Sequence, residues 1–341
     1  MKHLANFQDS FHDLGHVDRR RVLQSIAAAA LPTVLGSAGA ATGWPQKPLR
    51  LIVGFPPGSS PDAIARTISE PLSQALGQAV IVENKVGAGG SIGVDAVAKA
   101  TDGHTIGLTG NGPLTTAKLL NPKLSFDVAR DLRPISLVAS SPFMLVGKMS
   151  IPATDLPGLI AYARSQGDRL SYGSVGVGSG GHLGMELLKS LTGIRAVHIP
   201  FPGNPQVVTA IMAGDIDLSL AIPSIVVPQA KNGRLRIFGV STASRAAAFS
   251  DVPSIGQSLK LPGFDVDAWN AIFAPASMPE AIAARLSQEI SRILKSPDIR
   301  QRLFDQGWKS LGTSPEGLAN RIKDDTLLWA GIIRSTNTRG E

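Results

Sequence analysis

The sequence predicts an α/β protein made of two domains. Short apolar runs that end in glycine- or proline-rich loops alternate with amphipathic helical patterns, which is typical of parallel strands joined by crossover helices. A second series of such units starts after Ser150, and 341 residues are enough for two domains of ordinary size. We therefore expect two sheets, each mostly parallel and flanked by helices.

The first series begins with the apolar run LRLIVGF at 49–55, which is followed by a proline-rich loop and a helix opened by Asp62. In this helix apolar residues recur every three or four positions up to Leu76, and Pro71 is expected to bend it. The next expected elements are a strand at 79–83, a loop at 84–90, a helix at 91–100, a strand at 104–109 and a loop at 110–113. The repeated order of strand, loop and helix favours a parallel sheet.

The second series follows a strand near 143–146. Its expected elements are a helix at 155–165, a strand at 170–173, a glycine-rich loop, a helix at 182–191, a strand at 196–199, a helix at 205–213, and strands near 216–221 and 236–240. The C-terminal third then becomes helical, and its last helix starts after Ser314 and runs to about Ile333. The expected domains are residues 44–147 with 263–341, and residues 148–262.

The first forty residues have the pattern of an export signal. Three arginines at 19–21 precede a mildly apolar run at 22–35, and the small residues Ala38 and Ala40 follow it. Because the apolar run is too short to span a bilayer, we expect residues 1–40 to be a signal peptide and the mature protein to be periplasmic. The adjacent arginines resemble a twin-arginine signal, and an ordinary secretory signal with a basic start is the alternative.

The composition excludes several kinds of chemistry. With no cysteine, the chain has no disulfide, no thiolate metal site and no cysteine nucleophile. The three histidines outside the leader, His104, His182 and His198, lack the spacing of a metal pair, so we expect neither a metal nor a cofactor. The net charge of +7 would suit an anionic partner, but scattered basic residues and 5% aromatic residues argue against nucleic acid.

Three strand-to-helix loops are rich in glycine, at 56–61, 87–93 and 174–181. Such loops let backbone N–H groups approach a ligand closely, and the helix that follows directs partial positive charge toward it. A tight turn with no ligand is the alternative for any single loop. Because the loops occupy corresponding places in both halves, we expect a cleft between the domains that binds an acidic ligand.

The third of these loops also contains a G-x-G-x-x-G pattern, formed by Gly176, Gly178 and Gly181. This pattern between a strand and a helix is typical of dinucleotide-binding folds, but there the next strand ends in an acidic residue that binds the ribose. Here the next strand ends in Ile199 and Pro200 with no acid. An exported nicotinamide-dependent oxidoreductase is therefore the alternative function.

Several segments match one known family in detail. They are GFPPGSSPD at 54–62, ENKVGAGGSIG at 83–93, LSYGSVGVGSGGHL at 170–183, VHIPFPG at 197–203, KNGRLRIFGVSTASR at 231–245 and LPGFDVDAWNAIFAPASMP at 261–279. Over nearly the whole mature chain, the sequence resembles the periplasmic substrate-binding proteins of tripartite tricarboxylate transporters, the Bug or TctC-like proteins.

This resemblance implies a type II-like periplasmic binding protein, whose two α/β domains are joined by two crossings and close over a carboxylate. It implies a function without catalysis: the protein captures a small organic acid, such as a dicarboxylate, a tricarboxylate or an aromatic acid. The acid is then delivered to integral membrane transporter subunits or to a membrane sensor.

The resemblance also implies which residues bind the ligand, because in that family backbone N–H groups and short hydroxyls of two loops hold the carboxylate. One wall would consist of Phe55, Gly58, Ser59, Ser60 and Asp62. The opposing wall would consist of Ser174, Gly178, Ser179, Gly180, Gly181 and His182, with Asn111 as a further candidate. The alternative for His182 is packing against the loop, and Trp269 is expected to pack between the domains.

The sequence departs from the family in the cleft region. Gly58-Ser59 replaces a double glycine, Pro200-Phe201-Pro202-Gly203 replaces Pro-Tyr-Lys-Gly, and a common aspartate is missing near 220–223. The loss of a phenol and an ammonium group favours a less polar or aromatic acid over citrate, provided that these positions face the ligand.

Overall fold

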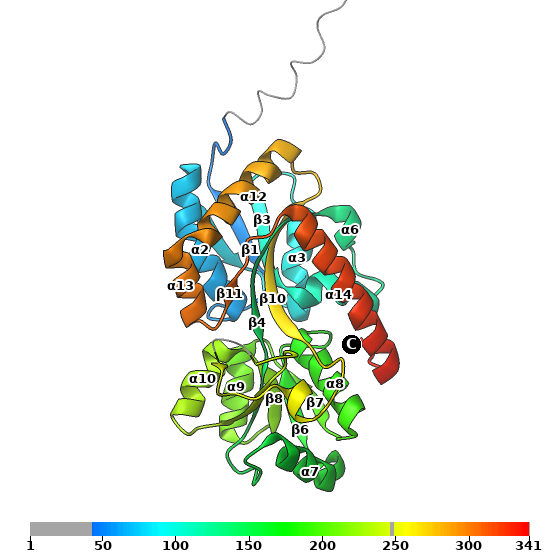
Figure 1. The fold of residues 1–341 in the computed structure, drawn as a ribbon. Coiled ribbons are helices and arrows are strands. Elements are labelled where there is room, and N and C mark those ends of the chain that lie inside the picture. Colours follow the sequence, from blue (N-terminus) through cyan, green and yellow to red (C-terminus); the bar gives the residue numbers. More distant parts are fainter. Residues whose placement is uncertain (1–42, 246–248, 341) are drawn as a thin grey trace, which may run out of the picture. The chain divides into compact units, whose positions relative to one another are not determined.

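The structure of the protein is a computed structural model that describes residues 43–245 and 249–340. The predicted signal peptide at 1–40 lies outside the described residues. All helices and strands named below lie in the compact unit that starts at Pro45 (Figure 1). In the described ranges, no helix is both long enough and apolar enough to cross a membrane.

The first sheet is six-stranded, in the order β11-β4-β10-β3-β1-β2. Its strands are β1 (Leu49–Val53), β2 (Val80–Asn84), β3 (Thr105–Gly110), β4 (Leu132–Pro142), β10 (Asp267–Pro275) and β11 (Lys309–Ser310). β1 is parallel to β2 and β3, as the repeated strand-loop-helix order predicts. β10 runs antiparallel to β3 and β4, so the sheet is mixed.

The second sheet is five-stranded, in the order β7-β6-β8-β5-β9. Its strands are β5 (Met144–Gly147), β6 (Ser171–Ser174), β7 (Val197–Pro200), β8 (Leu218–Ala221) and β9 (Arg236–Val240). β6 is parallel to β7 and β8, whereas β5 is antiparallel to β8 and β9. This sheet repeats the plan of the first, with a parallel half and an antiparallel half.

Helices pack against both sheets. Those around the six-stranded sheet are α2 (Ser60–Leu76), η1 (Ala88–Gly90), α3 (Ser91–Ala98), α4 (Asn111–Thr115), α5 (Ala117–Leu120), α6 (Val128–Asp131), α12 (Glu280–Lys295), α13 (Pro297–Asp305) and α14 (Pro315–Thr336). Those around the five-stranded sheet are α7 (Leu156–Gln166), η2 (Gly167–Arg169), α8 (Gly180–Thr192), α9 (Asn204–Ala213), α10 (Pro223–Lys231) and α11 (Ile255–Ser258). We call each sheet with its helices the first lobe and the second lobe.

Each lobe has its own hydrophobic core. In the first lobe Ile52, Leu137 and Phe273 belong to one buried cluster, and in the second lobe Met144 and Val208 belong to another. Full burial of such a side chain contributes about 1.5 to 3 kcal/mol, so each core stabilises its own sheet. The predicted domain limits stay a prediction. We propose that the boundary between the domains follows the sheets, which places it next to β5, between β4 and β5.

Two segments connect the lobes, and one buried serine joins them. β4 leads to β5 through the single residue Phe143, and after α11 the chain returns through residues 259–266 into β10. The Ser241 hydroxyl accepts a hydrogen bond from the Phe143 N–H at 2.8 Å and donates one to the Val266 carbonyl at 2.5 Å. Backbone bonds from Ser241 to Phe143 and from Val266 to Ser241 complete this tie. Figure 1 shows β4 and β10 side by side, in agreement with their pairing.

Candidate ligand-binding site

A cavity lies between the loops of the two lobes. It encloses about 790 Å³, including the part that opens to solvent. Its walls come from the loops after β1, β2, β3 and β6 and from β10 itself. Within the part of the chain that the structure describes, no residue lining this cavity is charged. A charged ligand would therefore be bound by neutral groups.

Several helices begin at the cavity wall, among them α2, α3, α8 and α9. Residues at the starts of α2, α3, α8 and α9 line it: Ser59 and Ser60, Ser91, Ser179 and Gly180, and Gly203 and Asn204, respectively. The first N–H groups of a helix have no partner within the helix, and the helix dipole adds about half a positive charge at that end. The cavity can therefore attract an anion although no cationic side chain lines it.

Four polar side-chain atoms in the cavity wall are buried without a hydrogen-bond partner among the described residues. They are Ser59 Oγ, Ser60 Oγ, Asn111 Nδ2 and Asn270 Oδ1, and the exposed fractions of these residues are 2%, 5%, 6% and 2%. An unpaired buried polar group costs about 1 to 3 kcal/mol. A polar ligand that pairs with these atoms would recover this cost.

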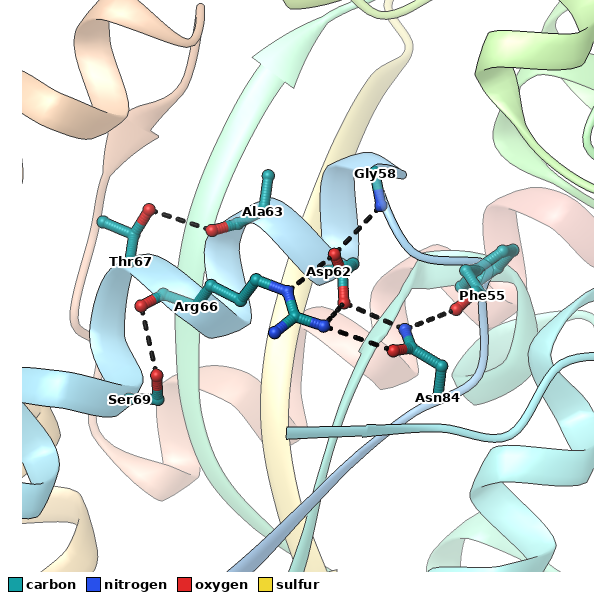
Figure 2. Close-up of polar contacts among 8 residues, drawn as sticks. All are labelled: Phe55, Gly58, Asp62, Ala63, Arg66, Thr67, Ser69 and Asn84. Carbon is teal, nitrogen blue, oxygen red and sulfur yellow. Dashed lines mark hydrogen bonds and ion pairs between the residues drawn. The ribbon is translucent and has the colours of Figure 1, made fainter. Parts of the chain in front are cut away.

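The loop after β1 is held in place by Asp62. Its carboxylate accepts the Gly58 N–H at 3.0 Å and the Asn84 Nδ2 at 2.9 Å, and it forms an ion pair with Arg66 at 3.0 Å (Figure 2). Asn84 also donates to the Phe55 carbonyl at 2.9 Å. Burial alone would raise the pKa of Asp62, but the hydrogen bonds from Arg66, Gly58 and Asn84 outweigh it and lower that pKa. Asp62 therefore stays ionised and fixes the loop that precedes α2.

Two histidines hold the loop after β6 from behind. His182 Nδ1 accepts the Gly178 N–H at 3.2 Å, and His198 Nε2 lies 2.7 Å from Ser174 Oγ. The two imidazole rings have their centroids 4.1 Å apart. Burial lowers the pKa of His182 to about 3 and that of His198 to about 4, so both rings are neutral near pH 7. A neutral His182 is required here, because a protonated Nδ1 could not accept the Gly178 N–H.

The two lobes contact each other at the cavity. Thr116 Oγ1, just after α4 in the first lobe, donates to the Gly178 carbonyl of the second lobe at 2.7 Å. Gly178 has a φ of +80°, and a Cβ there would lie 2.4 Å from Leu120 Cδ1 and 3.0 Å from Thr116 Oγ1. A side chain at this position would therefore separate the lobes, which explains the glycine.

The comparison with known protein families agrees with this geometry. Residues 64–338, most of the chain, match the model of the tripartite tricarboxylate transporter family receptor. The chain belongs to this family. The solved structures that resemble this chain include the periplasmic binding protein BugD. This is the class of protein that the sequence resemblance predicted.

Curated relatives match this chain over most of its length. A protein from the tcbD–tcbE intergenic region of Pseudomonas sp. (strain P51) is 36% identical over 325 residues, which are 94% of this chain and 95% of the relative. The protein BugT of Bordetella pertussis (strain Tohama I) is 32% identical over 298 residues, covering 87% of this chain and 91% of BugT.

Solved structures share the fold. A Rhodopseudomonas palustris protein with bound malate has a TM-score of 0.80 and 30% identity, and the match covers 85% of this chain and all of that one. An R. palustris protein with adipate has a TM-score of 0.84 and 28% identity over 87% of this chain and all of that one. The two-domain α/β fold of a periplasmic binding protein, predicted from the sequence, is therefore confirmed.

The structure brings most of the predicted site residues to one cavity. Those that line it are Phe55, Ser59, Ser60, Asn111, Gly178, Ser179, Gly180 and Gly181. Gly58, Asp62, Ser174 and His182 are not among the lining residues and instead form the hydrogen bonds that hold the two loops. The roles of all twelve toward a ligand stay predictions.

The sequence analysis did not single out some of the residues that line the cavity. Asn270, Phe143, Thr116 and Trp308 line the cavity, and Asn270 comes from the middle of a buried strand. The signal for Asn270 was present, because it is a lone amide within the apolar run of β10. Phe143 and Trp308 read as ordinary core residues, and only the fold brings them to the cavity.

The G-x-G-x-x-G pattern lies in the loop between β6 and α8 and in the first turn of α8. The next strand, β7, ends at Pro200 without an acidic residue that could bind a ribose. The family match and the relatives give no support for the oxidoreductase alternative.

Proposed function

We propose that the protein is an extracytoplasmic solute-binding protein that captures a small organic carboxylate in the cavity between its lobes. It delivers this ligand to the membrane subunits of a tripartite tricarboxylate-type transporter, and it acts as a carrier rather than as an enzyme. The observation that carries the proposal is the set of four unpartnered, buried polar atoms in an uncharged cavity at several helix starts. The relatives solved with adipate and malate support a carboxylate as the ligand class.

The carboxylate would be held by several moderate interactions. Ser59 and Ser60 offer hydroxyl groups, Asn111 offers an amide N–H, and the starts of α2 and α8 offer backbone N–H groups. A hydrogen bond to a charged group contributes about 1.5 to 3 kcal/mol, so three or four of them reach the roughly 8 kcal/mol of a micromolar complex. Such binding is tight enough for capture and weak enough for release.

The remaining walls of the cavity suit the carbon skeleton of the acid. Phe55, Phe143, Trp269 and Trp308 line it together with aliphatic side chains. Binding is favoured when these side chains cover the apolar surface of the ligand. They cannot solvate a second or third carboxylate of the ligand. This favours acids with a sizeable apolar body over citrate.

Calorimetry with the purified mature protein tests the ligand class. The panel contains dicarboxylates, tricarboxylates and aromatic monocarboxylates, and we expect micromolar binding of at least one acid. The double variant Ser59→Ala, Ser60→Ala should bind that acid about 10- to 100-fold more weakly, because two hydrogen bonds are lost. Ser165→Ala, on the exposed surface of α7, is the matched control and should bind normally. A folded protein that binds no acid of the panel would contradict the proposal.

We also propose that the protein is exported to the periplasm, in line with the periplasmic binding proteins among its relatives. The support in this chain is the arginine-containing start, the short apolar run and the small residues up to Ala40. The intact mass of the exported species should correspond to a chain that starts near Ala41. Replacing Arg19 and Arg20 with lysine should block export by the twin-arginine route and leave secretory export intact. A mature chain that still starts at Met1 would disprove the export signal.

A further inference from the structure

Asn270 is a polar residue in an otherwise apolar strand. It lies in β10, where its backbone pairs with Gly110 of β3 on one side and Ala139 of β4 on the other. The register toward β4 shifts directly after Asn270. Its side chain lines the cavity, only 2% of the residue is exposed, and Oδ1 has no hydrogen-bond partner among the described residues. This is a buried hydrogen-bond acceptor without a partner.

A second unpartnered amide, that of Asn111, lines the same cavity. Asn270 Oδ1 is 3.9 Å from the place that a Cβ on Gly110 would occupy, and Asn111 is the next residue after Gly110. Asn111 Nδ2 is also buried and unpartnered, and it lies 2.9 Å from the Cβ position of Gly180, the first residue of α8. The two amides do not pair with each other. The cavity thus presents one donor and one acceptor near the helix start where a carboxylate would bind.

In the orientations that the structure gives to the two amides, a carboxylate alone does not satisfy both, because an ionised carboxylate only accepts hydrogen bonds. It can accept from Asn111, but it would leave Asn270 Oδ1 unpaired or opposed by a second acceptor. An ammonium group would satisfy Asn270, but no acidic side chain among the described lining residues would balance its charge. A neutral hydroxyl group fulfils the requirement.

We propose that the ligand is a 2-hydroxy acid and that Asn270 determines this specificity by accepting a hydrogen bond from the hydroxyl group. Asn111 donates to the carboxylate or to the hydroxyl oxygen of the same ligand. The inference rests on the proposed function, because it assumes that a carboxylate binds at the helix starts. It goes further by naming the group that the ligand carries next to the carboxylate.

The test compares acids that share a carbon skeleton. One series contains 2-hydroxyglutarate, 2-oxoglutarate and glutarate, and the other contains mandelate, benzoylformate and phenylacetate. In the series that fits the cavity, the hydroxy acid should bind at least about tenfold more tightly than the acid without the hydroxyl group. The acid without the hydroxyl group leaves the buried acceptor of the site unpaired, which weakens its binding. The keto acid, which offers only an acceptor, should bind no better than the unsubstituted acid.

Variants assign the effect to Asn270. In Asn270→Leu the preference for the hydroxy acid should fall to about threefold or less, since leucine has a similar size and no acceptor. Asn232→Leu is the matched control: it makes the same change at an exposed residue directly after α10, outside the cavity lining, and should keep the preference. If Asn270→Leu does not fold, the preference of the wild-type protein and that of Asn270→Ser, which retains an acceptor, decide the question.

The outcomes separate the two proposals. If acids bind but the hydroxy and unsubstituted acids bind equally, or the keto acid binds best, the specificity role of Asn270 is wrong while the carboxylate function stands. The same holds if Asn270→Leu keeps the preference or Asn232→Leu abolishes it. If no acid of either series or of the broader panel binds to the folded protein, both proposals are wrong.

Discussion

At the scale of single residues, His182 and His198 combine a structural role with a chemical constraint. Burial, the proximity of His198 and the charge of Lys189 all lower the pKa of His182. For His198, burial and Lys189 lower the pKa, while Glu186 opposes them. Tyr172 completes the group, with its hydroxyl donating to Glu186 at 2.5 Å. The loop that lines the cavity thus depends on a neutral imidazole that accepts the Gly178 N–H.

This arrangement predicts a loss of stability in acid. His182 titrates near pH 6.5 in the unfolded chain and near 3 in the folded protein, so between these values the unfolded chain binds more protons. The free energy of unfolding should therefore fall with decreasing pH, by up to about 1.4 kcal/mol per pH unit from His182 alone. Melting temperatures measured from pH 7.5 to 4.5 should fall more steeply for the wild type than for His182→Gln, which removes the titrating ring.

The quantity to compare is the difference between the wild type and His182→Gln in how the melting temperature falls with pH. Carboxylates with lowered pKa values, such as Asp62, also make both proteins less stable in acid, and this effect cancels in the difference. Parallel curves for the wild type and His182→Gln would show that His182 does not couple folding to pH.

At the scale of elements, the hydrogen bond between Thr116 and Gly178 predicts how much the contact between the lobes contributes to binding. Thr116→Val removes the hydroxyl that donates across the cavity to the Gly178 carbonyl. We expect ligand affinity to fall about fivefold to tenfold, since one neutral hydrogen bond of the closed form is lost. Calorimetry with the best acid of the panel measures this change.

Thr115→Val is the matched control for this prediction. The Thr115 hydroxyl donates to the Asn111 carbonyl within the same helical turn, so its loss affects one lobe only. The control should lower the melting temperature without a comparable loss of affinity. Equal losses of affinity in both variants would mean that the bond between the lobes has no special role in binding.

The elements that the sequence predicts best are those with strong local signals. The strand, glycine-rich loop and helix around Gly178 were expected at 170–173 and 182–191, and the structure has β6 at Ser171–Ser174 and α8 at Gly180–Thr192. The strand expected at 236–240 is β9, with the same bounds. Here apolar runs, glycines and helical periodicity all indicate the same structure, so tertiary contacts had little to override.

The sequence did not predict the two long strands that lead toward the second lobe. β4 contains Pro134 and ends at Pro142, and proline is unfavourable inside a strand. β10 is buried along nearly its whole length, so it lacks the alternation of apolar and polar residues that marks a half-exposed strand. Because Asn270 lies in β10, missing this strand also meant missing its place in the cavity wall.

At the scale of the whole molecule, the two connections between the lobes predict closure upon binding. Contacts between loops of different lobes, such as that of Thr116 with Gly178, can form only when the lobes are close together. We therefore expect ligand to convert an open form into this closed one by a hinge motion. Saturating ligand should reduce the radius of gyration in X-ray scattering and change the fluorescence of Trp269 and Trp308, which line the cavity.

Gly178→Asp provides the control for closure. Its side chain would meet Thr116 and Leu120 of the other lobe, and its charge would repel an anion, so this variant should neither bind nor contract. A melting scan establishes that it folds. If saturating ligand leaves both the scattering and the fluorescence of the wild-type protein unchanged, the hinge motion is wrong.

The tie at Ser241 limits the kind of motion that is open to the molecule. Because this serine bonds to Phe143 in one connection and to Val266 in the other, the two connections cannot slide past each other without breaking buried hydrogen bonds. The motion that keeps these hydrogen bonds intact is a rotation of one lobe relative to the other about Ser241. The angle between the lobes then reports how far the cavity has closed, and a ligand too large for the site would stop the rotation at an intermediate angle.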